Sequence, residues 1–587
     1  MRKHNQLWIG ATAFGVAVLV GTVGAQVGRG GSEWLTAHGD AQRTSWIRTD
    51  PKISVESMSK PGFELQWSAK LDNRSREMNG LAQGVSANGV TLFVPMSIVT
   101  GSSNNVFALD NDTGYVVWQR TFDAAMPAPT PACPGGITAA ATRIVPLMPP
   151  PIAAPAPAGG GRATQSYRSV IGEPGMGVPL EARGRGPAPA PPAARGGQNA
   201  PGAPAAAGPP AAPPATPPGA PAGQPQRQGG GGGFGGGAPV TIPGATTEQM
   251  GGGRGGLGRP SGVVYAVSSD GMLHVLGLPS GKDIQRPAQF VPANARWSDL
   301  IAVNTTLYAT TSGSCAGAPN AVWAIDLESA SKPAVSWKAG DGQDIVGAVA
   351  FTIDGTAIVA RSNAIVALDG KTLQEKDSFT DPSITFVTGP TLFGHNGKEI
   401  VAAGTKDGRI VLLDAASLGG ASHSTPLYAS AAGLGSLAAD ALTTWQEMTV
   451  TAAPTPAPGA TPPQAPATPL PPIVTLGTRW ILAPLSTGVV ALKLEDSGGK
   501  LSLAKGWQSP SLTAPATPVV VNGVVFTLSK PAVLQAFDGK TGKALYTSQK
   551  TMTTAASPRS FWSAMGQVYV GSNDGTLYAF GFVDERR

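Results

Sequence analysis

Short apolar runs of four or five residues recur along the chain, and each is followed by a turn sequence. Examples are GVVYAVSSDG from Gly262, KEIVAAGTKDG from Lys398 and QVYVGSNDG from Gln567. Runs that alternate or stay apolar over this length are typical of buried β-strands. The Asp-Gly that often follows favours a tight hairpin, because glycine accepts the positive φ that such turns need. The pattern predicts an all-β protein built from hairpins.

A second unit recurs after these strands, and its clearest copy is FALDNDTGYVVW at Phe107–Trp118. It consists of Ala-x-Asp, a Thr-Gly turn, and a strand that ends in an aromatic residue. The Asp can accept hydrogen bonds from amides of the turn, and the aromatic side chain can cover a neighbouring unit. A four-stranded sheet of this kind cannot cover both its faces alone, so the units must stack in a ring. Related copies lie at 323–337, 366–379, 411–428 and 535–546.

Counting the sheets fixes the size of the ring. The last unit ends at GTLYAFGF (575–582) and leaves no room for an outer strand, whereas FELQWSAKL (63–71) lies upstream with Trp67 in the outer-strand position. We therefore predict an eight-bladed β-propeller of four-stranded antiparallel blades, closed by an N-terminal strand that completes the last blade. The eight candidate second strands start near Thr91, Val263, Thr306, Thr356, Glu399, Arg479, Val524 and Gln567.

Composition divides the chain further. Residues from roughly Met126 to Pro260, and a second tract at 451–472, are dominated by Pro, Ala and Gly. Such tracts bury too little apolar surface to offset the entropy of ordering them. The propeller is therefore predicted to span 63–587, interrupted by disordered insertions at about 126–136, 144–260 and 451–472. Each tract separates the inner strand of a blade (ITAAATRIV from Ile137, TTWQEMTV from Thr443) from its second strand. Both tracts are therefore expected on one face of the disc. They are either surface loops that tolerate change or part of a binding side.

The N-terminus predicts export. A positive start, an apolar run from Leu7 to Val23 and small residues up to Ala25 are typical of a signal peptide at 1–25, cut before Gln26. A retained membrane anchor is the alternative, and no later segment is apolar enough to cross a membrane. In the N-terminal segment that follows, 26–62, Trp34, Trp46 and the GDAQR between them are expected to plug or cap the disc. The mature protein is expected to be a monomer in the periplasm, at the outer-membrane periphery or secreted.

The distribution of charge limits the kinds of partner that are expected, and the cysteine content raises the question of a disulfide. The formal net charge of +6 is concentrated in the signal and in the Arg-containing first tract, which leaves the folded part close to neutral. A nucleic-acid binder should carry its positive charge on the folded face, so no nucleic-acid partner is expected. In an oxidising compartment the two cysteines, Cys133 and Cys315, are able to pair. The sequence leaves open whether they form a disulfide or stay as two buried thiols.

The repeat also carries a family resemblance. Ala108-Leu109-Asp110, with Thr113-Gly114 and Trp118, resembles the tryptophan-docking repeat of pyrroloquinoline-quinone (PQQ)-type propellers, and the resemblance covers essentially the whole ordered chain. That repeat is shared by quinoprotein dehydrogenases and by non-catalytic relatives, such as the propeller subunit of the outer-membrane β-barrel assembly machine. The opening EWLTAHGDAQRTSW (33–46) is similar to the start of exported PQQ-binding-like β-propeller repeat proteins. The resemblance implies the fold and leaves the chemistry open.

The motifs of a dehydrogenase are not found in the sequence. Quinoprotein dehydrogenases carry a disulfide between adjacent cysteines, a Ca²⁺ site and a carboxylate base, but this sequence has no Cys-Cys pair, no Cys-x-x-Cys-His and no assignable Glu…Asn…Asp set. It also lacks G-x-S-x-G and a phosphate loop. We expect no catalytic residue, metal or cofactor, with PQQ and Ca²⁺ as the alternative. The five histidines show no metal-ligand spacing: His4, His38, His274, His395 and His423.

One polar cluster is a candidate site. LDNRSREMN (71–79) connects the closing strand to the first blade and could line the top of the central channel; a solvated loop with local ion pairs is the alternative. Its candidate residues are Asp72, Asn73, Arg74, Arg76 and Glu77.

Three functions remain open. The leading hypothesis is a non-catalytic binding or assembly scaffold of the bacterial envelope with a protein partner. The alternatives are a PQQ-dependent dehydrogenase of alcohols or sugars, and an envelope-polymer binder.

Overall fold

The computed structural model describes residues 33–76, 80–87, 95–137, 139–147, 262–329, 334–431, 433–451, 473–549, 551–552 and 556–583. The predicted signal peptide, Glu77 and most of the two Pro/Ala/Gly tracts lie outside these residues. Within the described residues, no helix is both long enough and apolar enough to span a bilayer.

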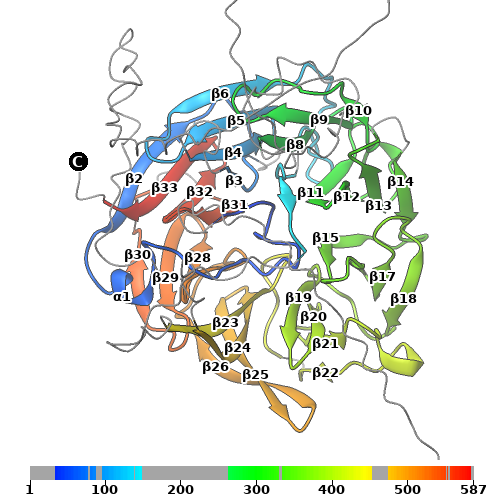
Figure 1. Ribbon diagram of the computed structural model, residues 1–587, viewed down its shortest axis with the longest axis vertical. Coiled ribbons are helices and arrows are strands. Elements are labelled where there is room, and N and C mark those ends of the chain that lie inside the picture. Colours follow the sequence, from blue (N-terminus) through cyan, green and yellow to red (C-terminus); the bar gives the residue numbers. More distant parts are fainter. Residues whose placement is uncertain are drawn as a thin grey trace, which may run out of the picture. The chain divides into compact units, whose positions relative to one another are not determined.

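Eight small sheets lie in a ring and confirm the predicted eight-bladed β-propeller (Figure 1). Helices are limited to α1 (Val55–Met58) and two 3-10 turns, η1 (Cys315–Gly317) and η2 (Gly420–Ser422), in the described chain. From inner to outer strand, blade 1 contains β3 (Val85–Ala87), β4 (Met96–Gly101), β5 (Asn105–Asp110) and β6 (Val116–Thr121).

The middle of the ring repeats the four-stranded antiparallel pattern three times. Blade 3 contains β11 (Arg296–Val303), β12 (Thr306–Ser312), β13 (Ala321–Asp326) and β14 (Val335–Lys338). Blade 4 contains β15 (Ile345–Phe351), β16 (Ala357–Arg361), β17 (Ala364–Leu368) and β18 (Glu375–Thr380). Blade 5 contains β19 (Thr391–His395), β20 (Lys398–Gly404), β21 (Ile410–Asp414) and β22 (Tyr428–Ala429).

Blades 6 to 8 complete the ring (Figure 1). Blade 6 contains β23 (Thr443–Thr451), β24 (Ile473–Leu485), β25 (Gly488–Ser497) and β26 (Lys500–Gln508). Blade 7 contains β27 (Val519–Val521), β28 (Val524–Ser529), β29 (Val533–Asp538) and β30 (Ala544–Thr547). Blade 8 contains β31 (Ala556–Ala564), β32 (Gln567–Ser572), β33 (Thr576–Phe582) and, as its outer strand, β2 (Phe63–Lys70).

The ring is closed by strand exchange between its two ends. β2 pairs antiparallel with β33, with Phe63 opposite Phe582 and Lys70 opposite Thr576. The prediction that the N-terminal strand completes the last blade is therefore confirmed. This pairing leaves no gap between the first and last blades, because one sheet contains both ends of the propeller.

Blade 2 departs from the predicted pattern. It contains β8 (Val263–Val267), β9 (Met272–Gly277) and a two-residue outer strand, β10 (Ala288–Gln289). The inner strand predicted from Ile137 is reduced to one antiparallel bridge, Thr142 with Tyr265. The chain then leaves this blade, and β7 (Ile144–Val145) pairs in parallel with β11 of blade 3. Without β7, backbone groups on the inner edge of β11 would be unpaired. This explains why the chain pairs with blade 3 here and does not form the predicted inner strand of blade 2.

The Asp of each repeat holds the turn that follows it, as predicted. The Oδ1 atom of Asp110 accepts hydrogen bonds from the backbone N of Asp112 and Thr113, at 2.9 and 2.8 Å, and from Thr113 Oγ1 at 3.0 Å. Asp369 and Asp538 make equivalent bonds to the two residues two and three positions later. The carboxylate therefore replaces a backbone acceptor in the hairpin between the third and outer strands.

The aromatic residue that ends a repeat docks on the next blade. The Trp118 Nε1 atom donates to the Leu278 carbonyl at 2.6 Å, and the indole covers Gly281 of blade 2. A Cβ atom on Gly281 would lie 2.4 Å from that ring, and its φ of +64° also favours glycine. The same arrangement joins blade 8 to blade 1 and blade 6 to blade 7: Trp67 with Gly114 and Asn111 O, and Trp507 with Gly542 and Gly539 O.

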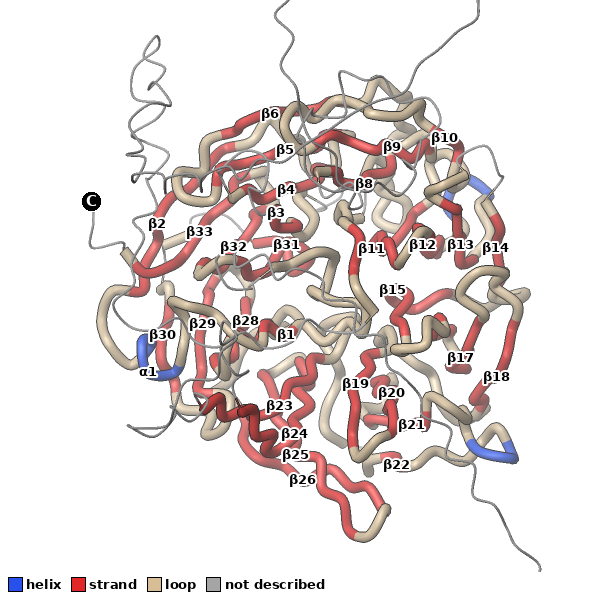
Figure 2. Tube along the Cα trace, in the orientation of Figure 1, coloured by secondary structure: helices blue, strands red, loops and turns tan. Residues whose placement is uncertain are grey.

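An N-terminal strap, defined as residues 33–53, crosses the centre of the ring (Figure 2). Within it β1 (Trp46–Ile47) pairs in parallel with β27 of blade 7. The strap makes hydrogen bonds of 2.7 to 3.1 Å to all eight blades, in chain order. Because the innermost strands have no neighbour on the channel side, the strap supplies partners for their backbone groups. The contacts are Trp34–Ser86, Leu35–Arg143, Thr36–Leu300, Ala41–Phe351, Gln42–Leu392, Thr44–Thr444, Ser45–Val520 and Asp50–Gly566.

Residues 126–136, predicted to be a disordered insertion, form an irregular loop with defined contacts instead. Cys133 forms a disulfide with Cys315 of η1, with a Cα–Cα distance of 5.5 Å. Arg76 Nε also donates to the Pro134 carbonyl at 2.8 Å. A covalent link and a charged donor thus order a segment whose composition alone predicts disorder.

Replacing both cysteines with serine is expected to lower the free energy of unfolding by about 2–4 kcal/mol, because the disulfide closes a long loop in the unfolded chain. Cys133 and Cys315 are 182 positions apart. Thermal unfolding of the double variant, with and without dithiothreitol, measures the effect. The reductant should lower the Tm of the wild type to that of the variant and leave the variant unchanged. An equal Tm for the oxidised wild type and the variant would contradict the prediction.

Candidate functional site

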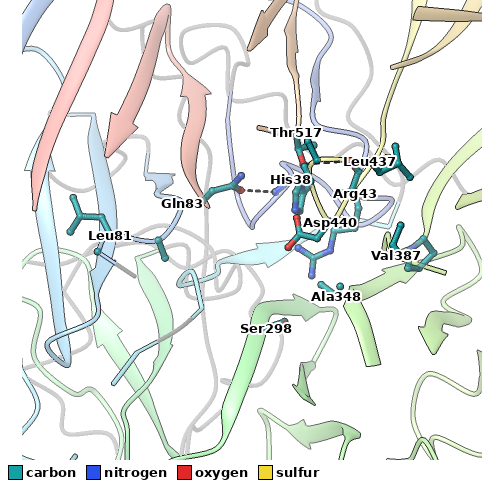
Figure 3. A pocket seen from close by; sticks show the side chains of 18 of the residues that line it. His38, Arg43, Leu81, Gln83, Ser298, Ala348, Val387, Leu437, Asp440 and Thr517 are labelled. Atoms are coloured by element: carbon teal, nitrogen blue, oxygen red, sulfur yellow. Dashed lines mark hydrogen bonds between the residues drawn. The ribbon is translucent and has the colours of Figure 1, made fainter. Parts of the chain in front are cut away.

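A central cavity of about 400 Å³ is the candidate site (Figure 3). Its wall combines loops that lead into the inner strands, parts of β11 and β15, and two strap residues, His38 and Arg43. The polar side chains in the wall are those of His38, Arg43, Gln83, Ser298, Asp440 and Thr517. The apolar part comes from residues such as Leu81, Ile137, Val387 and Leu437. Mixed walls of this kind are typical of ligand pockets.

His38 is fixed between the strap and blade 1. Its backbone N donates to Gln83 Oε1 at 2.9 Å, and its Nδ1 atom lies 3.1 Å from Ser45 Oγ. The residue has a positive φ of 59°, which turns the strap sharply at this point. His38 and Gln83 are 9 % and 8 % exposed, so their polar atoms serve first to hold the strap against the loop before β3.

Arg43 is the most deeply buried charged side chain of the wall, at 2 % exposure. Its Nε atom donates to the Val349 carbonyl at 2.9 Å, and Nη1 donates to the Ala37 carbonyl at 2.6 Å. A longer contact of 3.4 Å joins Nη1 to Thr36 Oγ1. The guanidinium therefore links the two limbs of the strap to β15 of blade 4.

Another part of the wall comes from the loop before β23. The backbone carbonyl of Asp440 accepts a hydrogen bond from Gly389 N at 2.8 Å, and Thr517 Oγ1 donates to the Ala441 carbonyl at 3.4 Å. The Asp440 side chain also faces the cavity, where it contributes a carboxylate to the same wall as Arg43 (Figure 3). This loop thus connects blades 5, 6 and 7 around the opening.

The described residues of the polar cluster predicted after the closing strand are not among those that line the cavity. Asn73 is buried and bonds Gly80 O and Ser103 N, and the Asp72 carbonyl accepts from Asn105. Backbone N of Arg74 donates to Ser103 Oγ at 2.6 Å. These residues therefore stabilise a layer of loops. Arg76 holds the disulfide loop, and Glu77 lies outside the described residues.

Only some of the residues that line the cavity could be predicted from the sequence. Arg43 lies in the GDAQR segment that predicts a cap, whereas Gln83, Ser298 and Asp440 carry no motif. They meet because the loops before several inner strands, and the irregular part of β11 that contains Ser298, lie at the ring axis. No local sequence signal indicates that position.

A Ser–His–Asp arrangement in blade 2 has the distances of a catalytic triad but the environment of a turn. His274 Nε2 lies 3.0 Å from Ser268 Oγ, and Nδ1 lies 2.8 Å from Asp283 Oδ1. Ser268 is 1 % exposed and also donates to Asp270, so its hydroxyl is not accessible to a substrate. The same Ser/Thr-x-Asp turn recurs in three hairpins without a histidine: Thr352–Asp354, Thr405–Asp407 and Ser572–Asp574.

The fold is an eight-bladed β-propeller, and a comparison of the sequence with protein families finds a match to part of the chain. Residues 464–583 match the family described as outer membrane protein assembly factor BamB. This region extends from just before β24 to the end of blade 8, about a fifth of the chain. The similarity to PQQ-type propellers that the repeats predicted is thus confirmed. No curated protein matches the chain in sequence.

Solved structures of two kinds are similar to the chain. BamB from Moraxella catarrhalis has 13 % identity and a TM-score of 0.35, with 56 % of this chain and 81 % of that chain covered. Quinohemoprotein alcohol dehydrogenase from Comamonas testosteroni has 13 % identity and a TM-score of 0.48, covering 95 % and 81 %. Quinohemoprotein alcohol dehydrogenase ADHIIG from Pseudomonas putida HK5 has 11 % identity and a TM-score of 0.44, covering 94 % and 80 %.

The described cavity wall does not fit PQQ with Ca²⁺. PQQ is a planar, anionic quinone and needs cationic or N–H donors that are directed at it. Arg43 is the one Arg or Lys among the described wall residues, and it already donates to two backbone carbonyls. Across the described part of the chain, no three His, Cys, Asp or Glu side chains converge as a metal-binding group. Oxygen-rich ligand sets of that kind are what Ca²⁺ prefers.

Proposed function

We propose that the protein is a non-catalytic binding scaffold of the bacterial cell envelope, which assembles with other envelope proteins through the faces of the propeller. The observation that carries the proposal is the use of the cavity's polar groups. Arg43, Gln83 and Thr517 bond backbone groups of the strap, of β15 and of the loop before β23. These groups stabilise the centre of the ring, which favours an architectural role for the channel.

Two further observations support a place in the envelope. The N-terminal run from Arg2 to Ala25 has the pattern of a secretory signal. Cys133 and Cys315 form a disulfide, which persists in oxidising compartments such as the periplasm. The family that matches residues 464–583 is described as an outer membrane assembly factor, and this is the kind of partner system that we propose.

A cofactor titration tests the non-catalytic part of the proposal. Mature protein is titrated with PQQ and Ca²⁺ by calorimetry, and dye reduction is then followed with a panel of alcohols and sugars. We expect no saturable heat and no turnover, because the described wall lacks convergent ligands for the quinone and the metal. Micromolar or tighter binding with turnover would overturn the scaffold assignment in favour of a dehydrogenase.

Site-specific cross-linking in intact envelopes tests the partner. A photo-reactive amino acid is placed at Tyr115 or Leu476, which are 60 % and 59 % exposed and belong to different blades. We expect discrete adducts with outer-membrane assembly proteins from at least one position, while the same residue at buried Val366 gives none. Adducts with peptidoglycan or polysaccharide alone would favour a polymer binder and contradict a protein scaffold.

A further inference from the structure

Two arginines flank one tryptophan where the strap meets blades 5 and 6. The Cζ atom of Arg48 lies 4.7 Å from the centroid of the Trp46 ring, and that of Arg479 lies 5.8 Å from the same centroid. Arg479 Cζ is also 5.3 Å from the ring of Phe393. Cation–π contacts of this length hold both guanidinium groups against apolar surfaces and away from bulk water.

Both guanidinium groups keep unused donors. Arg479 is 8 % exposed, and its Nη2 atom donates to Gly394 O at 3.1 Å and to Gln446 Oε1 at 2.7 Å. Its Nε atom is buried with no partner, and its Nη1 atom makes no hydrogen bond to a described residue. Arg48, which is half-buried, donates to no described residue and contacts Trp46 through its face alone. Buried donors of a charged group are costly when unpaired.

The two guanidinium groups place two positive charges close enough to interact. Burial and, to a smaller extent, the charge of Arg48 together lower the pKa of Arg479 to about 10. Burial also lowers the pKa of Arg48, and Asp40 opposes that effect. The Asp40 carboxylate already accepts from Thr44 N at 2.9 Å and Thr44 Oγ1 at 2.5 Å. Both arginines stay cationic at neutral pH, and the charge of Asp40 acts on Arg48.

An apolar side chain lies next to this pair. Along the β23–β24 hairpin, Gln446 is opposite Arg479 and Met448 is opposite Leu476. Residues directly opposite each other share a face of the sheet. A register shift between Gln446 and Met448 brings Leu476, three residues before Arg479 in β24, into the next pair along that face. Leu476 is 59 % exposed. A ligand that reaches the guanidinium groups therefore also meets an exposed apolar residue.

We propose that Arg48 and Arg479, which both lie against Trp46, form a binding site for a carboxylate that is attached to an apolar group. A guanidinium presents two parallel N–H donors that match the two oxygens of a carboxylate. The carboxylate supplies a negative charge, and its apolar neighbour covers Leu476. Two sources share this chemistry: a free small carboxylate, and an acidic segment of a protein partner. The existence of the site is argued from its geometry alone. Only the identification of the ligand as an acidic segment of a protein partner rests on the proposed scaffold function.

Calorimetry on the mature protein tests the site with defined probes. The probes are glutarate, a blocked peptide of alternating Glu and Leu, and the same peptide with Gln in place of Glu. We expect the Glu peptide to bind and the Gln peptide to fail. Binding of glutarate with equal affinity identifies a free carboxylate as sufficient, whereas binding of the peptide alone identifies an acidic segment. Binding of neither glutarate nor the Glu peptide would overturn the proposal.

Matched variants locate the binding. Arg48→Gln and Arg479→Gln should each weaken binding of the Glu peptide by about tenfold or more, since each removes a charge-assisted donor. Arg409→Gln removes a surface guanidinium that is paired with Asp407 at 2.7 Å and should leave binding unchanged. If Arg479→Gln does not fold, Arg48→Gln still decides the outcome, because Arg48 makes no hydrogen bond to a described residue. Equal affinity of Arg48→Gln and Arg409→Gln would refute the site.

Stability provides a readout that a purely structural role would not give. Without ligand, Arg48→Gln should raise the Tm, because it removes repulsion with Arg479. Saturating Glu peptide should raise the Tm of the wild type and leave that of Arg48→Gln unchanged. If Arg48→Gln lowers the Tm of the free protein and the peptide shifts both proteins equally, the two arginines stabilise the fold and bind no carboxylate.

Discussion

Replacing Trp67 with alanine is expected to lower the free energy of unfolding by about 3–5 kcal/mol, as is typical when a buried tryptophan is truncated. Trp67 is 9 % exposed in β2, and its Nε1 atom donates to Asn111 O at 2.8 Å. Its ring covers Gly114 in the first blade. The side chain therefore joins blade 8 to blade 1 at the point where the ring closes. Urea unfolding, followed by tryptophan fluorescence and by circular dichroism, measures the change.

Two neighbouring variants control for this effect. Gly114→Ala should also destabilise the ring, because the new Cβ atom would lie 2.4 Å from the Trp67 ring and φ is +71°. Tyr115→Ala, in the same turn but 60 % exposed, should change stability by no more than about 0.5 kcal/mol. If Trp67→Ala costs no more than Tyr115→Ala, docking of β2 does not hold the ring closed.

Replacing Arg43 with methionine is expected to cost about 2–4 kcal/mol, because it leaves buried carbonyls without donors while keeping most of the side-chain volume. Arg43 is 2 % exposed and donates to Val349 O and Ala37 O. The strap should also become more accessible, because the link between its two limbs and blade 4 is lost. Urea unfolding measures the first effect, and hydrogen exchange at strap amides measures the second.

Arg409→Met is the matched control for Arg43→Met. The Arg409 guanidinium pairs with Asp407 near the surface, and loss of such a pair costs no more than about 1 kcal/mol. Equal stability of the two variants would mean that water replaces the Arg43 donors. Faster exchange in the strap without a change in global stability would mean that the strap opens independently of the blades.

Together these variants separate two ways of holding a propeller closed. Trp67 acts at the rim, between the outer strand of one blade and a turn of the next. Arg43 acts at the axis, where the strap bonds the innermost strands. A propeller whose axis and rim are both fixed presents rigid faces, and rigid faces reduce the entropy lost when a partner binds. This rigidity is consistent with the scaffold function proposed above.

The sequence by itself determined the repeat and therefore the ring. Asp110, Gly114 and Trp118 act within or next to their own repeat, so their roles follow from local hydrogen bonding, positive φ and size. The same reasoning placed Trp67 in an outer strand and predicted its pairing with the C-terminal blade. These features could be predicted because their physical causes act over a few residues and recur along the chain.

Only the tertiary structure decided how the centre is built. The strap bonds Ser86 through Trp34, Leu300 through Thr36 and Val349 through Arg43, across separations of 52, 264 and 306 residues. Most of these bonds go to backbone groups, which every residue possesses, so they leave no signature in the sequence. The pairing of Cys133 with Cys315, the shortened inner strand of blade 2 and the meeting of Arg48 with Arg479 have the same origin. Each of these contacts depends on the positions in space of segments that are distant in the sequence. The closed ring determines those positions, and the local sequence pattern does not.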